Sequence, residues 1–212
     1  DTVRRKCMQT WTLFGAGNFT SEIIEAIEAN NDVVVSVVLN QEIDIAIREN
    51  LEKKGCKFIS IEEFNPNADR YFFGFVNTDK TAVLEKLSRF NIRFSNLVHP
   101  FSFVSPSVIF GQGNFIGAGS VVGAESKFGD FNIINRQVSV GHHVVVGNRN
   151  HIGPGVTVSG RCDIGSKNFF GSGSVVIDGI FMKDNIILGA GAVVIKNIVQ
   201  QGTYVGIPAK AL

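Results

Sequence analysis

The chain has 212 residues, enough for one large domain or two small ones with a buried core. Its 20 Lys and Arg residues almost balance its 19 Asp and Glu residues, which argues against a nucleic-acid or anionic-membrane partner, because such partners need a clustered positive field. The three cysteines are scattered, which favours unpaired thiols in a reducing cytoplasm, and no apolar run is long enough to span a bilayer. We therefore expect a cytoplasmic protein with no membrane insertion.

Charge and glycine content divide the chain near residue 103. Residues 1–103 hold 26 of the 39 charged residues but only 4 of the 23 glycines. A change of composition of this kind is typical of a domain boundary. We therefore predict one domain over residues 1–103 and a second over residues 104–212.

The first half alternates segments that are typical of strands and helices. Strands are predicted over 10–14 and 32–39, and the residues between them recur at helical spacing, with Thr20 or Ser21 as the N-cap. Further elements are predicted in the order helix 42–54, strand 57–60, strand 71–76, helix 79–90 and strand 92–98. This order predicts a small α/β domain with a Rossmann-like parallel sheet.

The second half repeats an apolar residue every six positions. Sixteen positions spaced six apart, from Val104 to Val194, are all apolar, and glycine follows ten of them. Neither an α-helix nor an ordinary strand has this period, whereas a solenoid does: each unit is a short strand and a turn, its first residue points inward, and its glycine takes the tight corner. We therefore predict a parallel β-helix whose coils bury a continuous apolar column.

Five further segments accompany these repeats. They are LFGAGN (13–18), NLVHP (96–100), VGHHVVVG (140–147), NHIGPGV (150–156) and GTYVGIPAK (202–210). With them, the chain resembles the hexapeptide-repeat acyltransferases, whose units form a left-handed β-helix with three units to a coil. Over nearly its full length it resembles the sugar acetyltransferases that join a small nucleotide-sugar-binding α/β domain to an acetyl-CoA-binding β-helix, and the bacillosamine-pathway type is the nearest match.

The resemblance implies an enzyme that transfers acetyl from acetyl-CoA to the amino group of a UDP- or dTDP-linked amino-dideoxy sugar for surface-glycan synthesis. A sugar O-acetyltransferase of the sialic-acid type is an alternative, because one base serves both reactions, and a non-catalytic β-helical binding protein is another. The resemblance also implies a homotrimer that binds the coenzyme between neighbouring β-helices, and closed symmetry is the norm for oligomers.

Histidine is suited to remove the proton of an acceptor at neutral pH, because its ordinary pKa is about 6.5. By the resemblance, His142 is this base, and the residue after it is usually acidic and orients the imidazole. This chain has His143 there, so we expect Glu125, one coil below His143, to supply the carboxylate. The backbone N–H of Gly160, one coil above His142, is expected to stabilise the oxyanion.

The resemblance also implies residues that contact the coenzyme and the acceptor. His151 is expected near the bound acetyl-CoA, and Gly160, Ser172 and Ala190 are expected to line the coenzyme groove. Asn135 is expected close to the amino group that is acetylated.

Zinc binding is an alternative role for the histidines. Zinc needs ligands that converge in a tetrahedron. On an extended strand the adjacent His142 and His143 are expected to diverge, because successive side chains alternate faces. We therefore expect no metal.

The loop GAGNFT (15–20) begins like a dinucleotide-binding fingerprint. However, Thr20 stands where the third glycine falls, and Asn40 replaces the carboxylate that an NAD site uses. A glycine turn that opens onto a helix N-terminus still favours phosphate, although simple strand-to-helix packing also explains it. By the resemblance, the nucleotide sugar is held by residues at the ends of three strands, with the base left open: Gly17, Asn18, Phe19, Asn40, Gln41, Val76 and Asn77.

Overall fold

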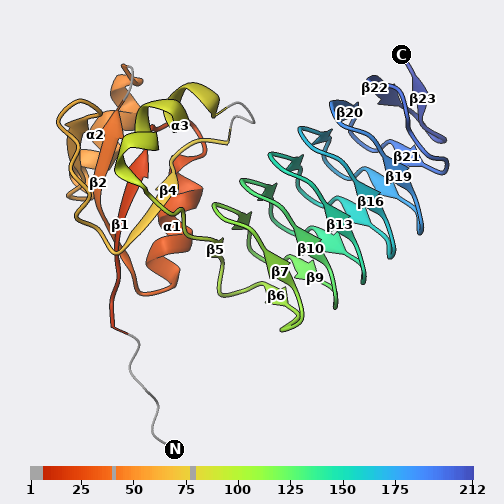
Figure 1. The fold of residues 1–212 in the computed structure, drawn as a ribbon, viewed down its shortest axis with the longest axis horizontal. Helices are drawn as coiled ribbons and strands as arrows, with labels where there is room; N and C mark the ends of the chain where they lie inside the picture. The colour runs from red at the N-terminus through yellow and green to blue at the C-terminus, as the bar shows by residue number, and fades with distance from the viewer. Residues whose placement is uncertain (1–6, 40–41, 77–79) are drawn as a thin grey trace, which may run out of the picture. The chain divides into compact units, whose positions relative to one another are not determined.

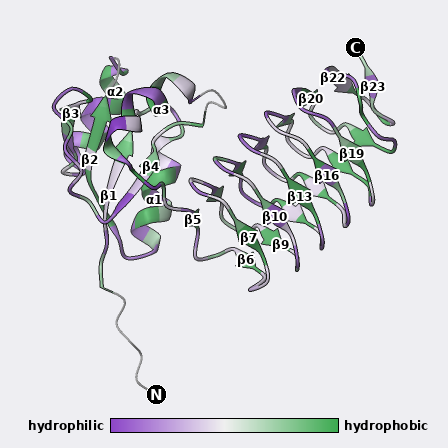
Figure 2. Cartoon of the chain, viewed as in Figure 1, coloured by the Kyte–Doolittle hydropathy of each residue, from purple (hydrophilic) through white to green (hydrophobic). Residues whose placement is uncertain are grey.

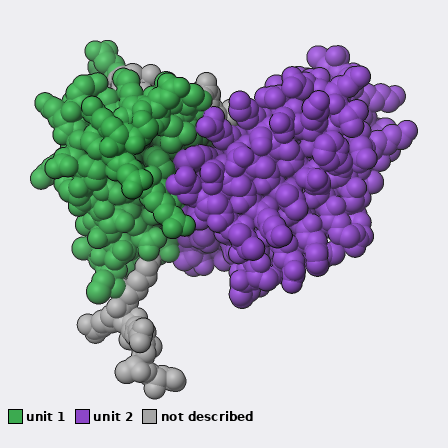
Figure 3. Space-filling model, viewed as in Figure 1, with its two compact units in different colours: residues 1–95 green, residues 96–212 purple. Residues whose placement is uncertain are grey.

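The computed structural model describes residues 7–39, 42–76 and 80–212. The chain forms two compact units, Asp1–Ser95 and Asn96–Leu212 (Figure 3). The division falls before the predicted position at 103/104, because β5 (Leu97–Val98) pairs with β8 (Phe115–Ile116) of the second unit. The segment predicted as the last strand of the first domain is therefore the first strand of the second unit.

The first unit contains the predicted parallel sheet. Its four strands lie in the order β3 (Lys57–Ser60), β2 (Val33–Leu39), β1 (Thr10–Phe14) and β4 (Arg70–Phe73), and every pair is parallel. Among the described residues, α1 (Thr20–Ala29) connects β1 to β2 and α2 (Ile45–Lys53) connects β2 to β3, whereas α3 (Thr81–Leu87) and η1 (Ser88–Phe90) follow β4. The strands are apolar and aromatic, so the centre of the sheet is buried.

Helices α1 and α2 begin in different ways. Asp44 caps α2, because its side chain accepts hydrogen bonds from the backbone N–H groups of Ala46 and Ile47 at 2.8 and 3.3 Å. Helix α1 has no side-chain cap, so the prediction of Thr20 or Ser21 as its N-cap is wrong.

The Thr20 hydroxyl has another purpose. It accepts a hydrogen bond from the Gly17 N–H and donates one to the Gly74 carbonyl, both at 2.7 Å. It thereby ties the glycine loop to the end of β4. The same close approach requires glycine at position 74, where an added Cβ would collide with the carbonyl oxygen of Gly15.

The second unit is a solenoid with three faces, which we name after one strand of each (Figure 1). The β12 face stacks β6 (Phe103–Val104), β9 (Val121–Val122), β12 (Ser139–Val140), β15 (Thr157–Val158), β18 (Val175–Val176) and β21 (Val193–Val194). The β13 face stacks β7 (Ile109–Phe110), β10 (Lys127–Phe128), β13 (Val145–Val146), β16 (Asp163–Ile164) and β19 (Phe181–Met182). The β14 face stacks β5, β8, β11 (Ile133–Ile134), β14 (His151–Ile152), β17 (Phe169–Phe170), β20 (Ile186–Leu188), β22 (Gly202–Val205) and β23 (Lys210–Ala211).

The pairing register confirms three six-residue units to a coil. Val140 pairs with Val122 below and with Val158 above, eighteen residues away in each direction. Of the sixteen predicted inward residues, all but Val104 and Phe110 are buried, and these two pack against the same apolar cluster. Figure 2 shows the apolar strands of this column along the solenoid.

The corner glycines serve a different purpose from the one predicted. Each of the ten that follow an inward residue lies in the described part of the chain, and none has a positive φ. Instead, an added Cβ would collide with the next coil: at Gly117 it would lie 2.7 Å from the backbone nitrogen of Arg136. The left-handed conformation falls two positions later, for example on Glu125 (φ 63°) and His143 (φ 56°). Close stacking of coils, and not the handedness of the corner, requires these glycines.

Other features of the sequence also have a place in the fold. Cys7, Cys56 and Cys162 are unpaired, and burial raises the pKa of the Cys56 and Cys162 thiols. None of the helices in the described ranges combines the length and the apolar character that crossing a bilayer demands.

Candidate active site

His142 and His143 lie in the turn between β12 and β13, and both are exposed. The left-handed conformation of His143 bends the chain so that the two rings meet. Their Nδ1 atoms are 3.0 Å apart and their ring planes are 89° apart. The expectation that the two side chains diverge is therefore wrong, because neither residue lies in an extended strand.

This contact bears on which nitrogen of His142 can act as a base. In a hydrogen bond between two ring nitrogens, one donates and the other accepts. When His142 donates from Nδ1, its Nε2 carries the lone pair. That Nε2 lies beside Gly160, 3.0 Å from the position that an added Cβ on Gly160 would take. A side chain at position 160 would therefore crowd the imidazole.

Gly160, the expected oxyanion donor, has an unpaired backbone N–H in the described part of the chain. Its carbonyl accepts a hydrogen bond from the Gly179 N–H at 2.9 Å, whereas its own N–H has no acceptor among the described residues. An unpaired backbone N–H is suited to an oxyanion. The structure thus brings the imidazole of His142 and Gly160 side by side from consecutive coils.

Glu125 occupies the position one coil below His143. Its backbone N–H donates to the Ser107 hydroxyl at 2.9 Å. Within the described ranges, no hydrogen bond joins its carboxylate to either imidazole. The direct hydrogen-bond partner of His142 is therefore His143 and not Glu125.

Two charged residues at this corner were missed from the sequence. Asp178 lies one coil above Gly160, and its Oδ1 is 3.0 Å from the position of an added Cβ on Gly160. The other carboxylate oxygen, Oδ2, forms an ion pair with the guanidinium of Arg161. The signal that locates Asp178 is the coil length, because it stands one coil from Gly160 and two coils from His142.

Apart from Gly160, the residues expected at the coenzyme and at the acceptor lie at a different corner. Asn135, Ser172 and Ala190 belong to the turns between the β14 face and the β12 face, and His151 lies on β14, which leads into these turns. The backbone N–H groups of Ser172 and Ala190 have no acceptor in the part of the chain that the structure describes, so they are available for a ligand. The β12 face separates these residues from His142.

Asn135 and His151 are both partly fixed by the protein. Asn135 is 6% exposed, and its Oδ1 accepts a hydrogen bond from the Arg136 N–H at 2.8 Å. The His151 ring lies against Phe169, with 5.1 Å between ring centroids.

The glycine loop of the first unit lines a cavity of about 260 Å³. Gly17 and Asn18 lie on its wall with the start of α1, and the opposite side is formed by α2 residues: Ala46, Ile47, Asn50 and Leu51. Phe19 is the N-cap residue of α1, and its side chain forms no capping hydrogen bond. Val76 is half-buried beyond the end of β4. Asn40, Gln41 and Asn77 lie outside the described residues.

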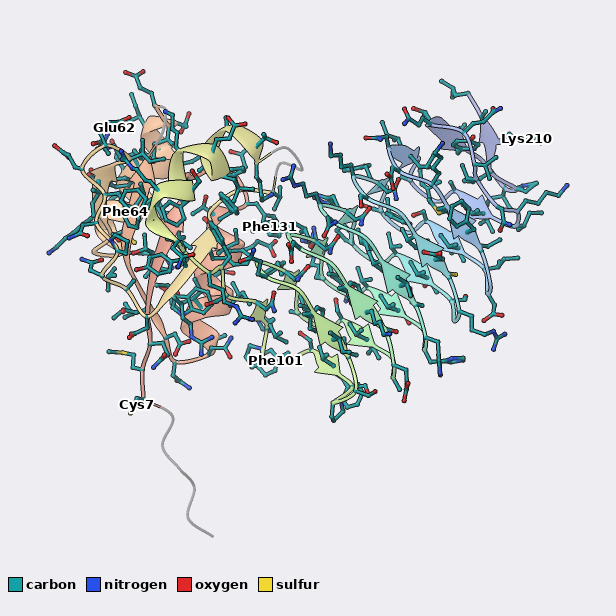
Figure 4. The ribbon with its side chains drawn as sticks, viewed as in Figure 1. Cys7, Glu62, Phe64, Phe101, Phe131 and Lys210 are labelled. Atoms are coloured by element: carbon teal, nitrogen blue, oxygen red, sulfur yellow. The ribbon has the colours of Figure 1, made fainter. Side chains whose placement is uncertain are left out.

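The closing segment forms a second cavity, of about 220 Å³, against the last coil. Strand β22 pairs with β20, and β23 pairs antiparallel with β22. The cavity is lined mainly by apolar groups and includes two lysines, Lys196 and Lys210, the second of which is labelled in Figure 4. Sequence reasoning used this segment only as a family signature and did not place a cavity here.

A metal centre was also sought in the side chains. In residues 7–39, 42–76 and 80–212, no three His, Cys, Asp or Glu side chains converge on a point where a metal could bind.

Comparisons with known proteins give full-length structural matches. Neither a protein-family model nor a curated protein matches the sequence. The acetyltransferase domain of PglB from Neisseria gonorrhoeae FA1090, in complex with acetyl coenzyme A, is 25% identical, with a TM-score of 0.83 over 97% of this chain and 100% of that chain. A mutant of perosamine N-acetyltransferase from Caulobacter crescentus, in complex with CoA and GDP-perosamine, is 26% identical, with a TM-score of 0.80 over 98% of each chain. WeeI from Acinetobacter baumannii AYE is 19% identical, with a TM-score of 0.79 over 97% of this chain and 100% of that chain, and it shows the shared fold alone.

These matches confirm two predictions. The chain has the predicted architecture, a small α/β unit with a parallel sheet followed by a left-handed β-helix. It also resembles the hexapeptide-repeat sugar acetyltransferases over its whole length, as its motifs indicate.

Proposed function

We propose that this protein is a cytoplasmic N-acetyltransferase that transfers acetyl from acetyl-CoA to the amino group of a nucleotide-linked amino sugar for surface-glycan synthesis. The observation that carries the proposal is that His142 Nε2 lies beside Gly160, whose N–H has no acceptor among the described residues. The fold supports it, because structures that bind acetyl coenzyme A or CoA match the chain over nearly its full length. UDP, dTDP and GDP sugars are all candidates, since one of these neighbours binds GDP-perosamine.

Acetyl transfer then proceeds without a covalent enzyme intermediate. His142 Nε2 removes a proton from the acceptor nitrogen, whose lone pair attacks the thioester carbonyl carbon. The Gly160 N–H stabilises the resulting oxyanion, and the C–S bond breaks as the CoA thiolate leaves and takes up a proton. A positioned base contributes about a hundred- to ten-thousandfold in rate, and one oxyanion donor contributes about a hundred- to a thousandfold.

His143 takes the place of the expected acid by accepting a hydrogen bond from His142 Nδ1. This contact keeps the lone pair of His142 on Nε2, where it faces Gly160. A neutral imidazole stabilises an imidazolium less than a carboxylate does. Glu125, one coil below His143, adds its negative charge at the same corner without a direct contact.

A homotrimer completes the site. The outward residues of the β12 face carry no charge: Phe103, Val121, Ser139, Thr157, Val175 and Val193. If three copies surround an axis with this face inward, the corner that carries His142 in one copy meets the opposite corner of the next. Ser172, Ala190, Asn135 and His151 of that copy then face His142, which agrees with their position across the β12 face. Closed rotational symmetry of this kind is the common form of oligomers.

The cavity beside Gly17 and Asn18 is the proposed nucleotide site. Helix α1 starts there without a side-chain cap, and the N-terminus of a helix favours a phosphate. Phe19 and Val76 lie near the same edge of the sheet, and Asn40, Gln41 and Asn77 are proposed to complete the site from the ends of β2 and β4.

The test is a panel of UDP-, dTDP- and GDP-linked amino sugars with acetyl-CoA, in which release of the CoA thiol is followed. We expect His142→Ala to lower kcat by about a hundred- to ten-thousandfold on the accepted sugar. His99→Ala, which removes a histidine outside the repeats, is the matched control and should leave kcat unchanged. Full activity of His142→Ala would overturn the mechanism, and absence of acetyl-CoA binding by calorimetry would favour a non-catalytic binding protein.

A further inference from the structure

Three consecutive coils place His142, Gly160 and Asp178 one above another at the same corner. His142 Nε2 and Asp178 Oδ1 each lie 3.0 Å from the position that an added Cβ on Gly160 would take. His142 Nε2 and Asp178 Oδ1 are therefore at most twice that distance apart. One ligand nitrogen can span such a gap by forming a hydrogen bond to each atom. The position directly over the Gly160 Cα is too tight even for a Cβ, but both side chains are exposed, so a ligand nitrogen would reach the imidazole and the carboxylate from the solvent side.

Arg161 holds the carboxylate in this orientation. Its guanidinium pairs with Oδ2 of Asp178, which leaves Oδ1 on the side of Gly160. The side chains of Arg161 and Asp178 are 62% and 46% exposed, and exposed ion pairs of this kind add little to stability. The pair therefore orients the carboxylate more than it stabilises the fold.

Asp178 is the acidic residue of this corner position, which is not acidic in the other coils. The equivalent corner position is occupied by Pro106 and Ala124 below His142 and by Lys196 above Asp178. The repeat thus does not require an acid here, and the one that is present stands where it faces the proposed base.

We propose that Asp178 binds the ammonium form of the acceptor and presents it to His142, which makes this site selective for an amine over a hydroxyl. The inference rests on the proposed function and specifies its acceptor. An amino group with a pKa near 8 is mostly protonated at neutral pH, whereas a hydroxyl carries no charge. A carboxylate beside the base therefore attracts the amine and offers no such attraction to a hydroxyl.

The protons and electrons balance as follows. One N–H proton of the ammonium ion passes to His142 Nε2, and the freed lone pair forms the C–N bond with the thioester carbonyl carbon. The C–S bond then breaks, the second N–H proton passes to the departing CoA thiolate, and His142 returns its proton to solvent. Asp178 stays charged throughout and attracts the positive charge of the bound ammonium group, so its contribution is to acceptor binding.

The test compares Asp178→Asn with the parent enzyme on the accepted amino sugar. We expect the acceptor KM to rise about ten- to a hundredfold, while the KM for acetyl-CoA and the kcat at saturating acceptor stay within about twofold. Asp178→Glu should recover most of the lost affinity. Asp163→Asn, an exposed acid-to-amide change on the β13 face, is the matched control and should match the parent enzyme.

The outcomes separate this inference from the proposed function. If the parent enzyme acetylates no acceptor, the proposed function fails. If the parent is active and Asp178→Asn keeps the parent acceptor KM, the inference is overturned. It is equally overturned if Asp178→Asn lowers kcat alone or weakens both substrates alike, or if the parent acetylates the matching hydroxyl sugar as efficiently as the amine.

Discussion

In the α/β unit each functional position occurs once, at the end of one particular strand, whereas in the solenoid every position recurs in each coil. The wall of the cavity proposed for the nucleotide is built from the single loop after β1, the start of α1 and α2. The corner that carries His142 is one of a series, with Ala124 below it and Gly160 above it. A residue of the solenoid can therefore be compared with the residues that occupy the same position in the other coils.

This difference teaches where to look for function in a repeat. The corner glycines and the inward apolar residues follow the repeat because every coil must stack on the next. His142 and Asp178 depart from the small residues that would satisfy the corner. Departures of this kind, which also include Lys196, are the candidates for function, and the proposed site uses the first two; the α/β unit offers no comparable internal standard.

The largest expected effect tests whether the two units are separate in stability. Phe170 is fully buried in the solenoid, and Phe170→Ala should cost about 3–5 kcal/mol of solenoid stability. Trp11 is the single tryptophan and is buried in the α/β unit, so its fluorescence reports that unit alone. In denaturant, the circular dichroism transition should shift while the Trp11 transition stays in place.

The neighbouring Phe169 provides the control, because it points outward and is 43% exposed. Phe169→Ala should change solenoid stability by less than about 1 kcal/mol. An equal shift of the Trp11 transition in Phe170→Ala would show that the two units unfold as one cooperative body.

A smaller effect on stability compares two positions of the solenoid corners: the glycine that packs against the next coil and the left-handed residue two positions later. Gly117→Ala should destabilise the solenoid by about 1–3 kcal/mol, because its Cβ would press on the backbone of the next coil. Asn185→Gly, at a left-handed position with φ 58°, should change stability by less than about 1 kcal/mol. Chemical denaturation measures both variants, and equal effects would contradict the division of roles between the corner positions.

At the corner proposed to be catalytic, His143→Phe removes the hydrogen-bond partner of His142 Nδ1 and keeps an aromatic ring. We expect kcat to fall about tenfold, the equivalent of one lost hydrogen bond, with unchanged nucleotide affinity. His143→Glu should restore kcat, because a carboxylate accepts the same hydrogen bond. Steady-state kinetics decide the matter, and a Phe variant with parent kcat would remove His143 from the site.

The smallest effect belongs to the α/β unit. Hydrogen bonds from the backbone N–H and the hydroxyl of Thr10 lower the pKa of Asp69 below its ordinary value of 3.8. The folded state therefore favours the charged carboxylate, and its contribution is present above that value and is lost as the pH falls through the lower, folded value. At neutral pH, Asp69→Asn should slightly lower the denaturation midpoint that Trp11 fluorescence reports. Below the pKa of Asp69 in the folded state, the substitution should leave this midpoint unchanged. A difference that grows in acid would contradict this.

The sequence by itself determined the elements that follow from periodicity. An apolar residue at every sixth position can be buried only if short strands stack in coils, so the β-helix and its inward residues from Ile116 to Val194 were predictable. The parallel sheet followed from the alternation of strands and helices. The contact of His142 with Gly160 followed from the coil length alone.

Only the tertiary structure decided how side chains meet at the corners. His142 and His143 converge because of one left-handed residue, and the repeat does not reveal which corner residue takes that conformation. Asp178 joins the site through a neighbouring coil, and Leu97–Val98 joins the solenoid through its pairing with β8. Periodicity specifies which residues face the core, whereas contacts between coils depend on backbone angles and on neighbours distant in the chain.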